Sequence, residues 1–478
     1  MQLILIVQVS IALLAGELGG LLPLGWFAGL LVLLAAPIGA LTAGALLARN
    51  AHRGMDRAQR RGVELFFASN SVIGWAVALL LITAASSELP LVWEPALSAI
   101  GVSAVLMLSA IASSLLWAVT AWSVEKRLRE SSMLRALDQL APLQAMPSRG
   151  AFVLAQARAG LVPLLAPLLV PLLSSEGARA LAMQWDPELV QEARLAGGVF
   201  GALLLFALVP LIVPPLLGLT RLAAGPTRDD LEALAHEAGV GVREIWVWPT
   251  QGLIANAAVM GAFPGLRCVM LSDGLLECMP REQVRAVMAH ELGHVVRRHL
   301  AWMLAVILAC WTIAGVAVTP VAEMLYQELA ATAAPSAQES IAQAASLGRE
   351  ACVMVLGLLL FGFASRRFER QADTFAVQLL SVRELEASAP TQRDGSIKST
   401  NGAIEAMVGA LGTVALLNHV PAERSSWRHG SIAWRQAYLR TLVGCETGAM
   451  TIDTFVAVLR WSALVIVLAG LVVGFFPF

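Results

Sequence analysis

The segment Ala286–Leu300 contains two histidines and a glutamate at a spacing that suits metal chemistry. His290 and His294 are four residues apart, so on a helix both rings lie on one face and can reach the same Zn²⁺. Glu291 stands beside the first histidine, where its carboxylate can take a proton from a water molecule that the metal activates. A chance HExxH in a chain this poor in histidine is expected on the order of 0.01 times. The pattern therefore predicts a catalytic zinc site, and the competing interpretation is a helix that merely carries two polar histidines.

A catalytic zinc usually has three protein ligands, so one more must come from elsewhere in the chain. Glu369 is the candidate, and Asp373, on the same helical face, can hold a ligating histidine or the helix itself. Taken alone, the charged residues from Arg366 to Asp373 could also be a solvated helix face at the end of a membrane span. The topology favours the metal, because His290 and His294 precede one apolar run and Glu369 follows the next. A two-helix hairpin returns all three residues to one side of the membrane.

The elements that position these residues must lie in a membrane. Apolar residues make up 58% of the 478-residue chain and charged residues only 14%, which is more apolar side chain than aqueous cores could bury. The net charge of −1 gives no basic surplus that would indicate nucleic acid as a partner. The 5 cysteines are odd in number and contain no CxxC pair, so a disulfide framework is not expected. The composition predicts an integral membrane protein in contact with the lipid bilayer.

Runs without Asp, Glu, Lys or Arg locate the spans, since a bilayer core needs about 20 apolar residues per helix. The runs are 1–16, 18–48, 65–87, 95–124, 159–175, 195–220, 300–322, 351–365 and 461–478. We expect eight or nine spans. Run 1–16 is interpreted as a retained first span and not a signal peptide. Run 159–175 contains three prolines and is either a kinked span or a re-entrant segment, and run 351–365 needs its flanking residues to cross.

Loop charges predict the orientation of these spans. Segments 49–64 and 125–158 are rich in arginine, whereas 88–94, 176–194 and 323–350 carry an excess of acids. The positive-inside rule places the first two in the cytoplasm and the other three outside. Continuing the alternation puts 221–299 and 366–460 in the cytoplasm. We therefore expect a multi-pass protein of the cytoplasmic (inner) membrane whose active site faces the cytoplasm.

The predicted fold is mainly α-helical, a multi-pass membrane protein with a cytoplasmic zincin-like domain that contains a small β-sheet. Helix and strand signals place a helix start at Pro226, strands near 245–248, 253–260 and 268–272, and a long helix after Met279–Pro280. Segment 381–402 is expected to be a loop. Five regions follow: 1–220 with the N-terminal spans, 221–299 with the HExxH helix, 300–365 with a membrane hairpin, 366–453 with the third ligand, and 454–478 with a last span.

The pairing of the HExxH motif with Glu369-x-x-x-Asp373 beyond a membrane hairpin resembles the membrane metallopeptidase family of the CAAX prenyl protease and the HtpX-type stress proteases. The resemblance extends from about Arg243 to Leu442. It includes the segments Asn256–Gly261 and Leu271–Leu276 before the active helix and Trp427–Arg435 after it. Two departures are present, since Gly430 stands where the family has proline and Ala258 where it has an aromatic residue.

This resemblance implies a zinc-dependent endopeptidase of the gluzincin type that acts on peptides or on membrane or misfolded proteins. It also implies that Asn256, Ala257 and Ala258 belong to an edge strand on which substrate lies, which β-augmentation would permit without a demand on side-chain sequence. His429 is implied as a donor to the oxyanion, and Arg435 as a partner of a substrate carbonyl or a structural residue. Without the family, the strand is a plain structural strand and His429 a loop histidine.

Two alternatives remain open at this point. A different HExxH membrane-protease family takes its third ligand from an Asp-Gly pair in a later span, but the Asp-Gly pairs here, at Asp273 and Asp394, are unsuitably placed. The other alternative is a non-enzymatic membrane scaffold or transporter with a relic metal site. The intact Glu291 argues against a relic. His299 lies nine residues beyond His290 and thus on the opposite side of one continuous helix, so it is interpreted as structural, as are the three remaining histidines, His52, His236 and His419.

Overall fold

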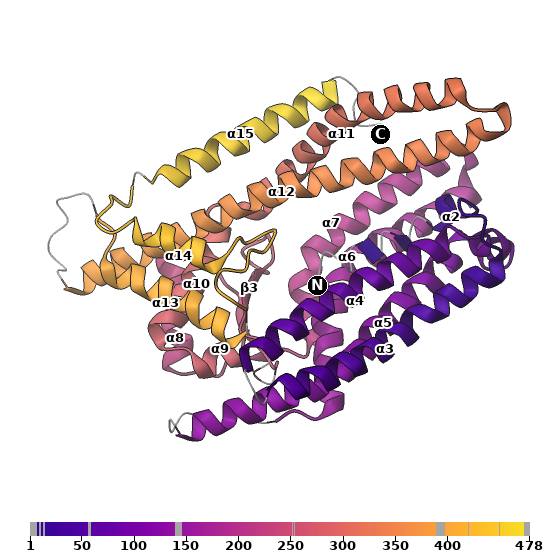
Figure 1. Cartoon of the computed structure of the whole chain (residues 1–478). Coiled ribbons are helices and arrows are strands. Elements are labelled where there is room, and N and C mark those ends of the chain that lie inside the picture. Colours follow the sequence, from indigo (N-terminus) through magenta and orange to yellow (C-terminus); the bar gives the residue numbers. More distant parts are fainter. Residues whose placement is uncertain are drawn as a thin grey trace. The chain divides into compact units, whose positions relative to one another are not determined.

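The computed structural model describes residues 7–472 except for 9–10, 13–14, 56–58, 139–145, 251, 253, 389–396, 419 and 449. The described residues are mostly helical and include one four-stranded sheet (Figure 1). Contacts divide the chain into two compact units, Met1–Leu205 and Phe206–Phe478. The predicted fold class is confirmed: a mainly helical, multi-pass membrane protein with a small sheet. The five-region division of the chain stays a prediction.

The first unit is helical, and most of its helices are long. In chain order they are α2 (Ala15–Leu18), α3 (Trp26–Met55), α4 (Gln59–Ala85), α5 (Leu89–Asp138), α6 (Arg149–Trp185), the 3₁₀ turn η1 (Pro187–Leu189) and α7 (Val190–Leu217), which continues into the second unit. Helix α3 packs against both α4 and α5. Small residues permit the close approach, since a side chain at Gly44 would collide with Trp117. Helix α6 continues without interruption through the proline-rich run 159–175.

Within the described residues, six helices are long and apolar enough to cross a membrane. They are Trp26–Arg49, Gly101–Arg127, Pro187–Leu217, His299–Thr332, Ala337–Ala387 and Thr451–Val472. A seventh span is counted if Val72–Ala85 and Leu89–Ala96, bent by 68°, form one broken span. This count is lower than the expected eight or nine, and run 1–16 falls largely outside the described residues.

The break between α4 and α5 differs from the expected loop at 88–94. Helix α5 already begins at Leu89, so most of this segment is helical. Ser87 is fully buried, and its hydroxyl oxygen accepts a hydrogen bond from the backbone N–H of Leu89 at 3.2 Å. This cap starts the new helix at once, and the chain changes direction within three residues.

The second unit contains the sheet and the remaining helices. The strands are β1 (Thr220–Arg221), β2 (Glu244–Trp248), β3 (Ala257–Met260) and β4 (Cys268–Ser272), and the helices are α8 (Pro226–Glu237), α9 (Asp273–Cys278), α10 (Arg281–Val296), α11 (His299–Thr332), α12 (Pro335–Ser388), α13 (Asn401–Leu417), α14 (Ile432–Arg440) and α15 (Thr451–Val472). The sheet order is β1-β2-β4-β3, with β2 and β4 parallel and the other pairs antiparallel. Strand β4 is buried throughout, whereas β3 is an edge strand.

Most of the expected elements of this unit agree with the structure, but several of their bounds differ. Strand β3 starts at Ala257 and not at Leu253, and the short β1 was not expected. The expected loop 381–402 is shorter, because α12 runs to Ser388 and α13 starts at Asn401. Thr400 ends the connection: its side chain accepts from the backbone N–H of Ala403 and donates to Glu384 at 2.6 Å.

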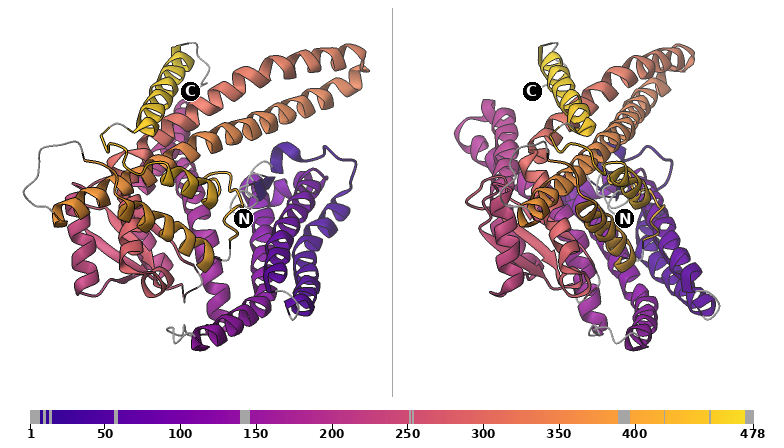
Figure 2. Two further views of the ribbon diagram at one scale, coloured as in Figure 1. Left: turned by 60° about the vertical axis from the view of Figure 1, so that its left-hand side comes forward. Right: turned by 90° about the vertical axis from the view of Figure 1, so that its left-hand side faces the viewer.

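Helices α11 and α12 form a long antiparallel pair that extends away from the sheet (Figure 2). The far half of the pair carries exposed apolar side chains such as Leu325 and Val355. The near half of α12 continues past the sheet domain and packs against α10 and α13. One continuous helix therefore connects the expected membrane region to the residues around Glu369.

Candidate metal centre

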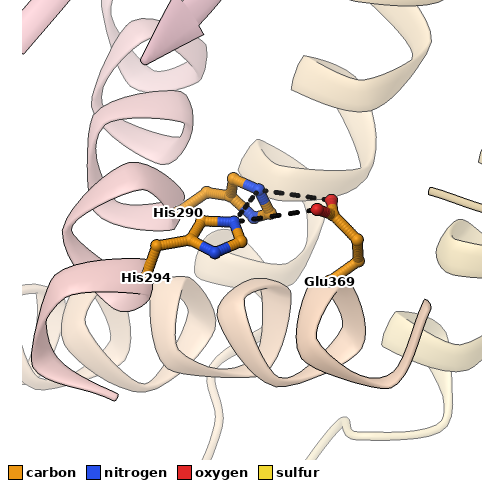
Figure 3. Close-up of side chains that lie close together, drawn as sticks. All are labelled: His290, His294 and Glu369. Carbon is orange, nitrogen blue, oxygen red and sulfur yellow. Dashed lines mark hydrogen bonds and ion pairs between the residues drawn. The ribbon is translucent and has the colours of Figure 1, made fainter. Parts of the chain in front are cut away.

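Helices α10 and α12 bring the three predicted ligands together. His290 and His294 project from successive turns of α10, and Glu369 reaches them from α12 (Figure 3). The two histidine Nε2 atoms are 3.3 Å apart. Glu369 Oε2 lies 3.7 Å from His290 Nε2, and Glu369 Oε1 lies 3.8 Å from His294 Nε2. His290 and Glu369 are buried.

Gly293, inside the HExxH motif, allows the two helices to approach this closely. A Cβ atom at this position would lie 3.0 Å from the Phe375 ring and 3.2 Å from the backbone oxygen of Ala372, both on α12. Backbone atoms cannot move aside as a flexible side chain can. The glycine is therefore needed for the helix contact that aligns the donors.

The donor set fits a zinc ion. Two nitrogens bound to one tetrahedral zinc at about 2.0–2.1 Å are about 3.3 Å apart, which matches the separation of the two histidine Nε2 atoms. Two imidazoles and a carboxylate, with all donor atoms within 4.8 Å of one another, are also the ligand types that zinc takes. Burial lowers the pKa of His294 to about 4, which keeps that ring neutral and its lone pair available.

Asp373 and Arg435 form a buried ion pair behind the donors. Asp373 is fully buried, and its Oδ1 lies 2.9 Å from His290 Nδ1. The Arg435 guanidinium donates to both carboxylate oxygens, at 2.7 and 2.6 Å, and lies 3.4 Å from Glu369 Oε2. Burial opposes the charged form of His290, but the Asp373 contact outweighs it and raises the pKa of that ring. A more basic ring is a better metal ligand.

His299 lies closer to the donor set than a single continuous helix would place it. Helix α10 ends at Val296, Arg298 adopts φ 52, and α11 begins at His299, so the residues from 290 to 299 do not share one helix. His299 is fully buried, with its Nδ1 2.8 Å from His294 Nδ1 and its Nε2 2.9 Å from Gln371 Oε1. His299 therefore supports a predicted ligand from behind. Neither Arg297 nor Arg298 is a residue type that signals a helix break, so the sequence carried no indication of this contact.

Glu291 has neighbours both in the donor set and in the edge strand of the sheet. Burial raises the pKa of its carboxyl group to about 7, although charge from His290 and a hydrogen bond from the backbone of Val259 act in the opposite direction. Val259 belongs to edge strand β3. The predicted base is thus adjacent both to the candidate ligands and to the strand predicted to hold substrate.

Strand β3 is held in place by contacts that sequence reasoning missed. Asn256, exposed at the start of the strand, forms two backbone hydrogen bonds with Ser272, one to the hydroxyl and one from the backbone N–H. The side chain of Asn418 bonds both the N–H and the carbonyl of Ala255, at 3.0 and 2.8 Å. Among the described residues, no strand pairs with the outer edge of β3, so Ala257 and Ala258 lie on a strand with one open side.

His429 lies close to the donor set. Its Nδ1 is 3.0 Å from Glu369 Oε1, while its side chain remains half-exposed. The next residue, Gly430, has φ 74, a left-handed conformation that proline cannot adopt. The absence of the family's proline is therefore required by this turn. His236 is exposed on α8, and the side chain of His52 and all of His419 fall outside the described residues.

Comparison with known proteins shows what the chain is similar to. Residues 225–393 match the model described as Peptidase family M48. The chain is 26% identical over 207 residues to a CAAX prenyl protease 1 homolog of Arabidopsis thaliana, covering 42% of this chain and 48% of that protein. It is 42% identical over 67 residues to protease HtpX of Chromohalobacter salexigens, covering 14% and 22%. The family resemblance inferred from the motifs is confirmed.

Among solved structures, the chain is similar to S. mikatae Ste24p, with 14% identity and a TM-score of 0.43 over 86% of this chain and 98% of that chain. The chain spans about half the length of the first curated relatives that it matches.

Proposed function

We propose that the protein is a zinc-dependent membrane endopeptidase that hydrolyses peptide bonds of peptides or of membrane or misfolded proteins at the cytoplasmic face. The observation that carries the proposal is that Glu291 neighbours both a three-residue donor set and a strand with an open edge. The similarity to proteins named as proteases supports it. A relic site in a scaffold or transporter would have no need to retain this carboxylate.

His290, His294 and Glu369 would hold the zinc, which when bound supplies a Lewis acid for the scissile carbonyl and lowers the pKa of water toward neutrality. Glu291 takes a proton from the attacking water and then delivers it to the leaving amine. A carboxyl whose pKa is near 7 can accept and return a proton at neutral pH. Asp373 fixes the orientation of His290 by the contact at 2.9 Å.

The substrate backbone pairs with the outer edge of β3, beside Asn256, Ala257 and Ala258. This strand addition gives main-chain hydrogen bonds with little demand on sequence. His429, half-exposed beside Glu369, donates to the oxyanion that develops on the scissile carbonyl. Arg435 is occupied by Asp373 and Glu369, so it acts as a positioning residue and does not bind the substrate carbonyl.

The side of the membrane is proposed from the charges of the loops. Segments 49–64 and 125–158 are arginine-rich, and the positive-inside rule places such segments in the cytoplasm. The domain with β3 and α10 lies on the same side when run 159–175, which is not among the six spans found in the described residues, also crosses the membrane as the sequence predicts. We therefore propose an inner-membrane location with the active site facing the cytoplasm.

The test is metal analysis of the detergent-purified protein together with a casein-type cleavage assay. The wild type should contain about one zinc per chain and cleave casein, with cleavage abolished by 1,10-phenanthroline. Glu291→Gln should keep the zinc and lose cleavage, whereas His290→Ala should lose both. A zinc-loaded wild type that cleaves nothing would favour the scaffold or transporter alternative.

A further inference from the structure

Two arginines of α12, Arg367 and Arg370, stack on aromatic rings. The guanidinium of Arg370 lies 3.3 Å from the centre of the Trp434 ring and 4.6 Å from that of Tyr438, both on α14. The guanidinium of Arg367 lies 5.7 Å from the same Trp434 ring, and it also lies over Phe363 and Phe455, at 4.8 and 5.3 Å. Both charges therefore gather around one indole.

The charges of these arginines are not neutralised inside the protein. Among the described residues, no carboxylate lies within ion-pair distance of either guanidinium, and neither Nε atom has a hydrogen-bond partner. The nearby acids of the same helix are used elsewhere, since Glu369 faces the histidines and Asp373 binds Arg435. Two adjacent positive charges without a counter-charge favour an anion at this place.

The surroundings of the pair are apolar and belong to candidate membrane spans. Phe363 on α12 and Phe455 on α15 are 42% and 44% exposed. One turn further along the same helices, away from the sheet domain, Leu359 and Val458 are 66% and 62% exposed. Helices α12 and α15 pack against each other, and both are long and apolar enough to cross the membrane. The arginines thus lie where the exposed apolar surface of two spans begins.

We propose that Arg367 and Arg370 bind the phosphate of an anionic phospholipid, whose acyl chains lie along the exposed faces of α12 and α15. A stacked guanidinium keeps its N–H groups at the ring edge, where they can form paired hydrogen bonds to phosphate oxygens. Tryptophan and tyrosine are typical of the membrane interface, and basic pockets beside membrane helices hold lipid head groups. The carboxylate of a peptide is also an anion and could bind the two arginines. It has no acyl chains, however, so it would gain nothing from the apolar surface beside them.

The experiment uses the full chain in an uncharged detergent and native mass spectrometry with phosphatidylglycerol or phosphatidylcholine of equal chain length. The wild type should retain phosphatidylglycerol at least tenfold more than phosphatidylcholine. R367Q/R370Q should abolish this preference, and R367K/R370K should retain part of it, because lysine keeps the charge but not the planar fork. The matched control is R424Q/R440Q, which removes the same charge from two exposed positions and should behave as the wild type.

The melting temperature and the zinc content of every variant show whether that variant is folded. If R367Q/R370Q does not fold, R367K/R370K takes its place in the comparison. Equal retention of the two lipids by the wild type would overturn the proposal, as would an equal loss in R424Q/R440Q. A third outcome would also overturn the proposal. In this outcome R367Q/R370Q retains the lipids as the wild type does, but it no longer discriminates between a peptide with a free carboxylate and the amide of the same peptide. The cluster would then be a peptide site.

Discussion

Replacing Asp373 by asparagine separates metal positioning from fold stability. In the wild type, Oδ1 contacts His290 Nδ1 and Arg435 Nη2, and Oδ2 accepts from Arg435 Nε. Asparagine keeps one oxygen and puts an amide donor in place of the other. Either the histidine or the arginine must then face a donor, although the volume of the side chain is unchanged.

The expected magnitude follows from these contacts. Loss of a carboxylate behind a ligating histidine lowers metal affinity by about 10–100-fold, or about 1.4–2.7 kcal/mol. Breaking a buried ion pair costs about 3–5 kcal/mol of folding stability, because the remaining charge is left without its partner. Arg435 keeps a second carboxylate nearby, at 3.4 Å from Glu369 Oε2, so we expect the lower end of that range.

The assay is zinc competition against a chromophoric chelator, with thermal unfolding of the metal-free protein in detergent. The double variant D373N/R435M is the control, since it removes the buried charge of both partners. It should recover much of the lost stability but not the zinc affinity, because His290 still lacks its carboxylate. Wild-type zinc affinity in D373N, or its full recovery in the double variant, would refute the positioning role of Asp373.

Four further outcomes are expected. Glu369→Ala should lose zinc, and full retention of zinc and cleavage would exclude it as the third ligand. His429→Ala should lower kcat by roughly 10²–10³ with unchanged zinc and substrate binding, whereas lost zinc would make it a ligand and an unchanged kcat would exclude the oxyanion role. The carboxylate form of Glu291 is the base, so kcat/KM should rise as the pH increases through the pKa of Glu291. Bound zinc lowers this raised pKa, so the rise should be centred at or below about pH 7. A flat profile of kcat/KM between pH 5 and 7.5 would contradict the role of Glu291 as base. Cysteine-accessibility labelling should place 221–290 in the cytoplasm and 323–345 outside, and labelling of both from one side would refute the hairpin.

Short-range patterns in the sequence predicted that His290, His294 and Glu369 would lie together, as they do in the structure. The spacing of His290 and His294 is a property of any helix, and the two apolar runs between His294 and Glu369 limited where the chain could return. Strands β2 and β4 were similarly predicted, because alternating or buried apolar runs bounded by glycine and proline identify strands. These features depend on neighbours in sequence or on the bilayer.

The parts that were not predicted depend on contacts between distant segments or on single backbone angles. The helix break before His299 rests on the positive φ of Arg298, in a residue type that rarely adopts it. The clamp on Ala255 comes from Asn418, and only the packing of α13 brings these two residues together. The direction change after α4 depends on the cap by Ser87, which a hydropathy profile does not register.

The location of the donors on both sides of the α11–α12 hairpin has a consequence for biosynthesis. Glu369 follows His294 by 75 residues, so at about 5–20 residues per second a ribosome produces it roughly 4–15 s later. During that interval the emerging chain holds two histidines and the adjacent Glu291 but no third donor. In the proposed topology, Glu369 joins them after α11 and α12 have entered the bilayer and α12 has returned to α10. Completion of the proposed metal centre would thereby be tied to membrane insertion, and a chain arrested before this step would not assemble it.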